Sequence, residues 1–339
     1  MGDRIVTIKD IAKRANVSVA TVSHVMNKTR FVSKILQDRV KKAIEELDYH
    51  PNIMAGSLRS RKTRVIGLIV PDNSNQLFAA LSKSIEQVSS SSDYNLMLCN
   101  SSYDFEMELS CIGVIRSKKV DGLIIIPTMT SPDPINQLVD NKLPVVILHH
   151  ILLGCRADSV IVNNIEGTYE ATRHLIDLGH RHIGYIDRPV DLPHSRERLN
   201  GYKKALEEKG IKEDDNVIRC NGFKYINGSE TMKNLLKQKP EMTAVLAFND
   251  TIAIGAIRAI DDKGLKVPDD ISIVGFDDIE LCSFITPRLT TVHFPKYKMA
   301  EEAVGLLLKR VKNPAVKKPV KKVLPLDLVV RESTSRARK

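Results

Sequence analysis

TIKDIAKRANVSVATVSHVMN, from Thr7 to Asn27, is the stretch of sequence that decides the fold. Two short segments with helical periodicity lie in it, on either side of the pair Asn16-Val17. Thr7 and Asp10 have the spacing of a capping box at the start of the first segment. The apolar residues of that segment recur at i, i+3, i+4 and i+7, as Ile8, Ile11, Ala12 and Ala15. Two short helices joined by a tight turn form a helix-turn-helix, the motif that lays its second helix in the major groove of DNA.

The second helix is predicted to start at Ser18 and to point Val22 and Val25 inward. Its outer face is small and mostly uncharged, which suits contact with base edges. That face consists of Val19, Ala20, Thr21, Ser23, His24 and Asn27. A third helix follows, with Ser33 placed to cap it and a break in the pattern at residues 49–51. Its apolar positions are Leu36, Val40, Ala43, Ile44 and Leu47.

The positive charge of the chain is concentrated at its two ends. Residues 1–64 hold 14 Lys and Arg against 6 Asp and Glu, residues 309–339 hold 11 against 2, and residues 65–308 carry a net charge of −7. A basic head with a helix-turn-helix pattern favours DNA, because neutralised phosphates supply most of the sequence-independent affinity. The basic tail is interpreted as a solvated C-terminus, with a second nucleic-acid contact as the alternative.

Length and composition predict a multidomain soluble protein with a small head and a core of two ordinary domains. No apolar run approaches the roughly 20 residues of a membrane span, and the N-terminus lacks the apolar stretch of a secretory signal. We therefore expect a cytoplasmic location and no membrane partner. The cysteines are scattered without a C-x-x-C pair, which indicates reduced, mainly buried thiols rather than disulfides or a zinc site. They are Cys99, Cys111, Cys155, Cys220 and Cys282.

The body of the chain alternates short apolar runs with segments of helical periodicity. The runs are Val65 to Val70, Tyr94 to Cys99, Gly122 to Ile126, Val145 to Leu148, His182 to Ile186, Ala244 to Phe248 and Ile271 to Phe276. This alternation is typical of α/β folds with doubly wound parallel sheets. About 240 residues exceed what one such sheet usually holds, so two Rossmann-like lobes are predicted.

Polar residues follow most of these predicted strands. They are Asp72 to Asn75, Thr128, His149-His150, Asp187-Arg188, Asn249-Asp250 and Asp277-Asp278. Ligands of doubly wound sheets bind beyond the carboxyl ends of the strands, so a cleft for a polar ligand is predicted there. Asn and Asp also favour turns for local reasons, which is the competing explanation for each one taken singly.

Catalytic motifs are missing from the sequence. It contains no G-x-G-x-x-G, no G-x-x-x-x-G-K-[ST], no H-E-x-x-H and no G-x-S-x-G. The close pair His149-His150 has few acidic neighbours, and His180 and His182 beside Gly179 are interpreted as structural. The sequence therefore predicts a protein that is not an enzyme and has no metal site and no cofactor.

A short connector, residues 52–63, is too brief and too polar to hold a helix alone. Leu58 is followed by the basic residues Arg59, Arg61, Lys62 and Arg64. This pattern fits equally a plain linker and a wedge that enters the minor groove of DNA once the connector is ordered.

Many motifs, in one order along the chain, resemble those of the lactose-repressor (LacI/GalR) family of bacterial transcriptional regulators. They are VSVATVSHVMNKTRFV, PNIMAGSL, LGHRHIGYI, RERLNGY, FNDTIAIGA, VPDDISIVGFDD, TPRLTTV and VVREST. The resemblance covers essentially the whole chain, and the head is most similar to the ribose and purine repressors. It implies a helix-turn-helix head at residues 1–50, a hinge helix at 51–63, and a periplasmic-binding-protein-like core at 64–339. The implied N-lobe comprises about 64–163 and 294–325, and the C-lobe about 164–293 and 326–339.

The resemblance also implies a homodimer whose paired heads bind a near-palindromic operator with a central C-G step. By this resemblance Val19, Ala20 and His24 select bases, and Leu58 is the minor-groove lever. Ser23, Asn27 and Arg30 support groove and phosphate contacts. The full set of expected DNA-binding residues is Thr7, Ser18, Val19, Ala20, Thr21, Ser23, His24, Asn27, Arg30 and Leu58. The tail after Val330 has no heptad pattern, so a dimer is expected and not a tetramer.

The core is expected to bind a small-molecule effector at residues that match the family pattern or follow a predicted strand. They are Asp72, Leu77, Phe78, Thr128, His149, Arg198, Phe223, Asn249 and Asp277. Amide, guanidinium and carboxylate groups with aromatic rings suit a polyhydroxyl ligand, so the leading interpretation is a sugar-responsive repressor. Two alternatives stay open, namely a purine-type corepressed regulator and a catabolite regulator controlled by a phosphocarrier protein.

Overall fold

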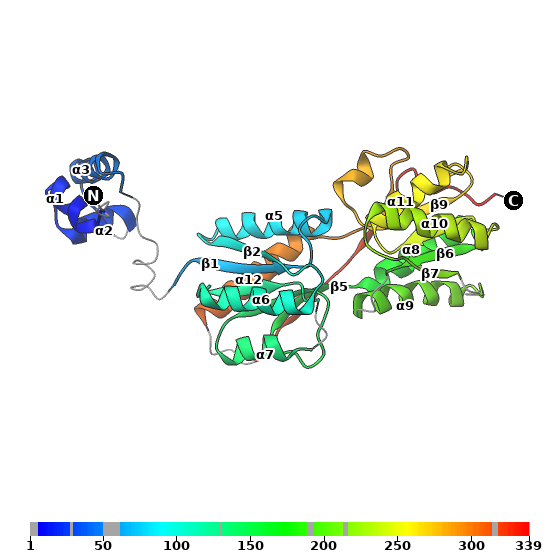
Figure 1. Ribbon diagram of the computed structural model, residues 1–339, viewed down its shortest axis with the longest axis horizontal. Helices are drawn as coiled ribbons and strands as arrows, with labels where there is room; N and C mark the ends of the chain where they lie inside the picture. The colour runs from blue at the N-terminus through cyan, green and yellow to red at the C-terminus, as the bar shows by residue number, and fades with distance from the viewer. Residues whose placement is uncertain are drawn as a thin grey trace. The chain divides into compact units, whose positions relative to one another are not determined.

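The computed structural model describes residues 6–27, 30–49, 62–128, 131–188, 193–212, 216–313 and 318–338 (Figure 1). The chain forms two compact units, Met1–Thr63 and Arg64–Lys339. No helix among the described residues is long and apolar enough to cross a bilayer. The five cysteines carry free thiols, and three of them, Cys111, Cys220 and Cys282, are buried.

The described residues of the first unit form a head of three helices. Its helices are α1 (Ile8–Ala15), α2 (Val19–Asn27) and α3 (Lys34–Glu46). They bury one small apolar core, made of Ile11, Ala12, Ala15, Val22, Val40 and Ala43. This arrangement confirms the predicted helix-turn-helix and its third, closing helix.

Hydrogen bonds at their N-terminal ends fix where α1 and α2 begin. The carboxylate of Asp10 accepts from the backbone N–H of Thr7 at 2.9 Å and from its hydroxyl at 2.6 Å. Ser18 caps α2, since its Oγ accepts from the backbone N–H of Thr21 at 3.0 Å. The prediction for Ser33 is wrong in one respect: it stands at the N-cap of α3 but its side chain makes no cap hydrogen bond. That end of α3 is exposed, so water can satisfy its backbone donors.

The second unit contains two sheets, each six-stranded in the described chain. The first has the order β11 (Lys321–Leu324), β5 (Asp158–Val162), β4 (Val145–His149), β3 (Gly122–Ile125), β1 (Val65–Val70) and β2 (Asn95–Asn100). The second has the order β12 (Asp327–Val329), β10 (Thr290–His293), β9 (Ser272–Asp277), β8 (Ala244–Ala247), β6 (Ile183–Asp187) and β7 (Val217–Arg219). Neighbouring strands are parallel except for the antiparallel pair β10 and β12.

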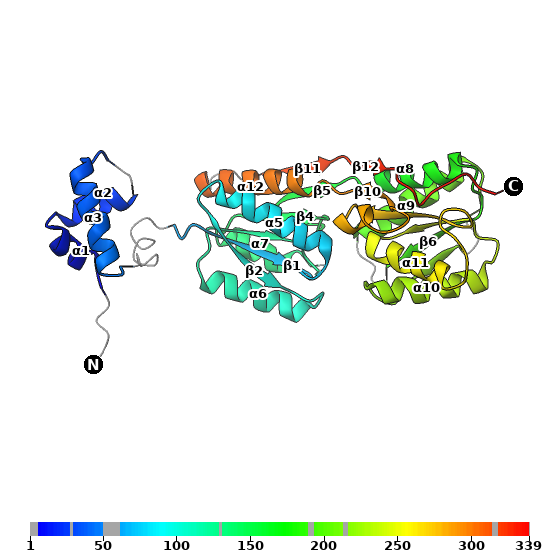
Figure 2. The ribbon, with the colours of Figure 1, turned by 90° about the horizontal axis from the view of Figure 1, so that it is seen from above.

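Helices cover both faces of each sheet (Figure 2). The helices of the first lobe are α5 (Gln76–Ser90), α6 (Phe105–Ser117), α7 (Asp133–Asp140) and α12 (Lys296–Lys312). Those of the second are α8 (Asn164–Asp177), α9 (Pro193–Glu208), α10 (Tyr225–Gln238) and α11 (Asp250–Asp261), with the 3-10 helix η1 (Glu280–Ser283). Successive residues of β1 show the two faces, because Leu68 belongs to the cluster that holds α5 and α12, and Ile69 to the cluster that holds α6 and α7. The predicted α/β class with two doubly wound lobes is confirmed.

The chain passes between the two sheets three times, after β5, after β10 and after β11. All seven predicted strands are present within one residue of their expected bounds. The prediction missed β5, β7, β10, β11 and β12, which are short or begin with polar residues. Asp158 at the start of β5 is buried because the Arg310 guanidinium of α12 donates to it at 2.5 and 2.7 Å.

Candidate ligand cavity and nucleic-acid interface

A cavity of about 480 Å³ opens where the carboxyl ends of strands from both sheets meet. Pro71 follows β1, Thr128 follows β3 and His149 ends β4, while Arg188 follows β6 and Asp277 ends β9. The lining residues are Pro71, Asn75, Leu77, Phe78, Tyr103, Ile126, Pro127, Thr128, His149, His150, Arg188, His194, Arg198, Phe223, Phe248, Asn249 and Asp277.

Most of the residues expected to bind the effector come together in this lining. They are Leu77, Phe78, Thr128, His149, Arg198, Phe223, Asn249 and Asp277. Asp72 is not among the lining residues. Its carboxylate accepts from the backbone N–H of Ser74 at 2.9 Å and from its hydroxyl at 2.7 Å, which is the local turn chemistry that Asp favours.

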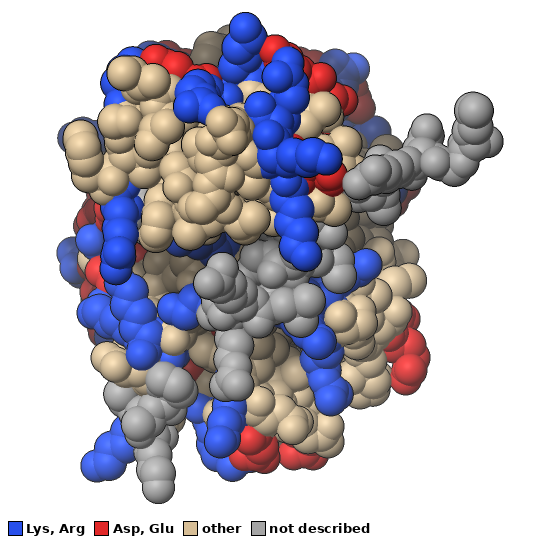
Figure 3. All heavy atoms as spheres, turned by 90° about the vertical axis from the view of Figure 1, so that its left-hand side faces the viewer, with Lys and Arg blue, Asp and Glu red and all other residues tan. Residues whose placement is uncertain are grey.

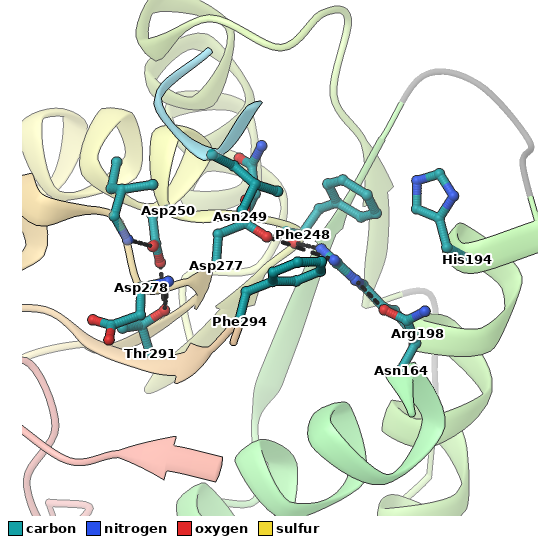
Figure 4. Close-up of polar contacts among 12 residues, drawn as sticks. Asn164, His194, Arg198, Phe248, Asn249, Asp250, Asp277, Asp278, Thr291 and Phe294 are labelled. Carbon is teal, nitrogen blue, oxygen red and sulfur yellow. Dashed lines mark hydrogen bonds and ion pairs between the residues drawn. The ribbon is translucent and has the colours of Figure 1, made fainter. Parts of the chain in front are cut away.

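Arg198 of α9 is held by the protein on several sides (Figure 4). Its Nε donates to Asn164 Oδ1 at 3.1 Å and its Nη1 to the backbone carbonyl of Phe248 at 2.6 Å. Its Nη2 lies 3.6 Å from Asp277 Oδ1, and its guanidinium lies 3.5 Å from the centroid of the Phe276 ring. With 1% of its surface exposed, Arg198 anchors the floor of the cavity by fixing Asp277 and the end of β8.

Two other predicted polar contacts are also engaged with the protein. The Oδ1 of Asn249 caps α11 by accepting from the backbone N–H of Ile252 at 3.0 Å. The hydroxyl of Thr128 donates to the buried carboxylate of Glu108 at 2.5 Å. These groups therefore hold the cavity wall in place as well as face it, which leaves fewer free partners for the hydroxyls of a sugar.

Burial sets the charge of the carboxyl groups near the floor. It raises the pKa of Asp277 to about 6, against the opposing effect of Arg198 and Lys296. Burial and the neighbouring Asp277 raise the pKa of Asp250 to about 7. The Asp250 carboxyl bonds the Thr291 hydroxyl and the Ile279 backbone N–H, so its role is to join α11 to the ends of β9 and β10 (Figure 4).

Three histidines meet at the opposite wall. His149 and His150 come from the end of β4, and His194 comes from the first turn of α9. The ring centroids of His149 and His194 lie 4.5 Å apart, and those of His150 and His194 lie 5.1 Å apart. Burial, with a smaller contribution from the nearby arginines, lowers the pKa of each ring, to about 4 for His150 and well below 6.5 for the other two. All three rings are therefore neutral at pH 7.

These imidazoles form a group that can hold a metal ion, and it is the one such group found among the described residues. One nitrogen of each ring lies within 4.8 Å of the others. The sequence offered only the pair His149-His150, because His194 reaches the cluster from a distant helix. Two guanidiniums, of Arg188 and Arg198, depress the pKa values of these rings, and the same positive charge opposes a divalent cation here.

Arg188 is the most important lining residue that the sequence did not single out. It stood in the predicted pair Asp187-Arg188 after a strand, but nothing in the pattern showed which of the two faces the cleft. Its guanidinium lies 4.9 Å from the ring centroid of Phe223, which in turn stacks on Tyr103 at 4.7 Å. Burial lowers the pKa of Arg188 to about 10, which still leaves the guanidinium charged at pH 7. Asn75 and His150, which also stood among the polar residues predicted to follow strands, line the cavity, whereas the sequence missed Tyr103, His194 and Phe248.

Because His150 is buried in its neutral form, the folding stability of the protein is expected to fall in acid. The folded protein holds the pKa of His150 at about 4, whereas the ordinary value is 6.5, so the unfolded chain takes up a proton first as the pH falls. Between pH 7 and pH 5, wild type is expected to lose about 2 kcal/mol of unfolding free energy relative to His150→Gln. Urea unfolding at both pH values measures this difference.

The matched control for that experiment is His182→Gln, which removes an exposed histidine. The carboxyls of Asp250 and Asp277 have raised pKa values and act in the opposite direction, but they are present in all three proteins and cancel in the comparison. A constant difference between wild type and His150→Gln from pH 7 to pH 5 would show that His150 is not held neutral.

The head presents the expected DNA-binding residues as follows. Thr7, Ser18, Val19, Ala20 and Arg30 are exposed, and Thr21, Ser23 and His24 are half-buried. Asn27 ends α2, but its side chain, like Leu58 and most of the connector, lies outside the described residues. Lys and Arg side chains are spread widely over the face in Figure 3, with fewer Asp and Glu among them. The mostly uncharged outer face of α2 suits base contacts, and exposed cations of the head such as Lys13, Arg14 and Arg30 suit phosphate contacts.

Comparison with known proteins agrees with this architecture. Residues 7–52 match the family of bacterial regulatory proteins, lacI family, and residues 172–334 match the periplasmic binding protein-like domain. The chain is 38% identical over 328 residues to the HTH-type transcriptional repressor PurR of Aliivibrio salmonicida (strain LFI1238), which spans 96% of this chain and 98% of that protein. The chain belongs to the lacI family of bacterial regulatory proteins.

Solved structures place this LacI-family chain beside sugar-binding and operator-binding relatives. The lac repressor dimer bound to operator and the anti-inducer ONPF matches with a TM-score of 0.86 and 28% identity, over 98% of this chain and 100% of that chain. The complex of the transcriptional regulator CelR with cellobiose matches with a TM-score of 0.72 and 31% identity, over 97% and 99%. The predictions of a DNA-binding, ligand-responsive regulator and of a non-enzymatic protein are confirmed by this membership.

Proposed function

We propose that this LacI-family chain is a corepressed regulator of the purine type, which binds a palindromic operator as a dimer when its cavity holds a purine-like ligand. The observation that carries this proposal is the 38% identity to a purine repressor along nearly the whole chain. It favours the purine alternative over the sugar-responsive repressor that the sequence placed first.

The geometry of the cavity supports a flat heterocyclic ligand. The aromatic rings of Phe78, Tyr103, Phe223 and Phe248 line it. Such rings stack on planar ligands, and offset stacking adds about 0.5–1.5 kcal/mol beyond the buried area. Asp277, whose pKa of about 6 lies near neutrality, can accept or donate a hydrogen bond to ring nitrogens. In this proposal the predicted DNA-binding residues of the head read the operator, and residues 51–63 connect the head to the two lobes.

A sugar effector is the second candidate, supported by the likeness to the CelR–cellobiose complex. Several polar groups that would meet sugar hydroxyls are already bonded to the protein, as Arg198, Asn249 and Thr128 are. The cavity therefore has few free hydrogen-bonding groups for a polyhydroxyl ligand, whereas its aromatic rings suit an aromatic ligand.

Fluorescence anisotropy on a palindromic duplex with a central C-G step tests the proposal. With the purified protein, a purine is expected to tighten operator binding at least tenfold, while pentoses and hexoses leave it unchanged. Phe223→Ala is expected to lose most of the purine effect, whereas Phe284→Ala, at an exposed phenylalanine outside the cavity, keeps it. If the ligand-free protein binds the operator tightly and a sugar weakens that binding, the sugar-induced repressor replaces the proposal. If no small ligand changes operator binding, a protein partner becomes the candidate effector.

A further inference from the structure

Arg188 has a buried positive charge that no ion pair within the described residues neutralises, and the neighbouring carboxyl of Asp187 offsets only part of the cost of its burial. Only 4% of its surface is exposed. Its Nη1 donates to His194 Nε2 at 2.5 Å, but its Nε and Nη2 have no hydrogen-bond partner. No carboxylate of the described residues forms an ion pair with it, in contrast to Arg198 and its partner Asp277. An unpaired charge in such a place is costly, because burial removes water that would solvate it.

The free atoms of this guanidinium belong to a cavity wall, so a bound molecule can satisfy them. Nε and Nη2 are adjacent donors in one plane, and this fork matches two oxygens of a carboxylate or a phosphate, or a carbonyl oxygen and the adjacent deprotonated nitrogen of an acidic ring. The Phe223 and Phe248 ring centroids, at 4.9 and 5.3 Å from the guanidinium carbon, restrict how the plane can turn. A neutral ligand would satisfy the hydrogen bonds but leave the charge uncompensated.

The histidine cluster adds donors beside this fork. Neither ring nitrogen of His150 has a partner, and Nδ1 of His194 has none. Their rings are neutral, so each offers one N–H and one lone pair. Since His194 accepts from Arg188 through Nε2, its proton stands on Nδ1, ready to be donated. Arg188, His150 and His194 thus form a donor-rich wall, which we call the cationic wall.

We propose that the effector carries an anionic oxygen group which the cationic wall binds, so that the corepressor is an acidic purine derivative rather than a neutral purine base. This inference rests on the proposed function, because the purine ring is taken from it. The anionic oxygens can come from the ring of an acidic oxopurine or from the phosphate of a purine nucleotide. Both present an anionic oxygen that can pair with the guanidinium of Arg188.

Isothermal titration calorimetry with matched ligands tests this inference. The neutral ligands are hypoxanthine and inosine, and the anionic ones are urate and inosine 5′-monophosphate. At least one anionic ligand is expected to bind ten times or more tightly than its neutral counterpart, and which of the two does so identifies the source of the oxyanion. Arg188→Gln is expected to bring that ratio close to one, while Arg258→Gln, with 71% of its side chain exposed, leaves it unchanged.

The outcomes separate this inference from the proposed function. If neither urate nor inosine 5′-monophosphate binds more tightly than its neutral counterpart, or if Arg188→Gln weakens all ligands equally, the inference is overturned and the purine corepressor stands. Binding of glucose 6-phosphate but of no purine, with loss in Arg188→Gln, supports the oxyanion and overturns the purine. Binding of none of the anionic ligands overturns the inference. If Arg188→Gln does not fold, Arg188→Lys keeps the charge without the fork and is expected to retain only part of the ratio.

Discussion

Replacement of Gly255 by alanine is expected to destabilise the core by about 3 kcal/mol or more, because the added methyl group would meet the backbone of a neighbouring helix. Gly255 lies in α11 where this helix crosses α10. A Cβ there would lie 2.0 Å from the backbone carbonyl oxygen of Tyr225 and 3.0 Å from the backbone nitrogen of Ser229. Because both contacts are with the backbone of α10, no side-chain rotation relieves them and the helices must separate.

Helix α10 also has a glycine where it crosses α11. A Cβ on Gly228 of α10 would lie 2.3 Å from the backbone carbonyl oxygen of Ile252 in α11. Glycine inside a helix costs about 1 kcal/mol relative to alanine, so its presence at both positions reflects the close approach of the two backbones. Chemical unfolding in urea, followed by circular dichroism, measures the loss in Gly255→Ala.

Gly113→Ala in α6 is the matched control. It also replaces a helical glycine, but no atom lies within 4 Å of the added Cβ. We expect it to leave stability unchanged or to raise it by about 0.5–1 kcal/mol, because alanine has less freedom to lose on folding. Equal stabilities of Gly255→Ala and Gly113→Ala would contradict the close packing of α10 and α11.

The strands of the core follow from the sequence, because a buried parallel strand is an unbroken apolar run. The strands that escaped prediction depend on distant partners. β10 begins with two buried threonines, and Thr291 is acceptable there because its hydroxyl donates to Asp250 at 2.5 Å. β5 likewise begins with Asp158, which Arg310 neutralises from far along the chain. Local periodicity contains no information on such pairs.

For the cavity, the sequence predicted the location of the site better than it predicted the individual side chains that line it. Polar residues after strands pointed to the correct edge of the sheets, since four of the expected effector residues that line the cavity were predicted in this way. The other four came from the family resemblance. The pattern did not separate Asp72, which closes a turn, from Arg188, which faces the cleft. It also missed Tyr103, an aromatic residue in the loop after β2 where only polar residues were considered, and His194, which reaches the cavity from the first turn of α9. Which side chain faces a cleft depends on the direction of each loop.

Replacement of Arg198 by methionine is expected to have the largest effect on the cavity, with a loss of about 3–5 kcal/mol in unfolding free energy at neutral pH. The variant removes the hydrogen bonds to Asn164 and Phe248 and leaves the carboxylate of Asp277 buried without its cation. Deletion of one member of a buried charge pair is costly for this reason, whatever the pair itself contributes. Thermal and urea unfolding measure the loss, and calorimetry with the purine panel is expected to detect no binding.

Two causes of the lost stability in Arg198→Met can be distinguished, namely the unpaired carboxylate of Asp277 and the lost packing of the Arg198 side chain. If the stranded carboxylate is responsible, the pKa of Asp277 rises above its value of about 6 once Arg198 is gone, and the variant regains stability as the pH falls from 8 to 5, when Asp277 becomes neutral. Adding Asp277→Asn to Arg198→Met is then expected to restore stability at pH 8. Arg258→Met, which breaks only exposed ion pairs, is expected to stay within about 0.5–1 kcal/mol of wild type. A double variant no more stable than Arg198→Met would show that the packing of Arg198 against Phe276 and Phe248 accounts for the loss, and that the ion pair with Asp277 contributes little.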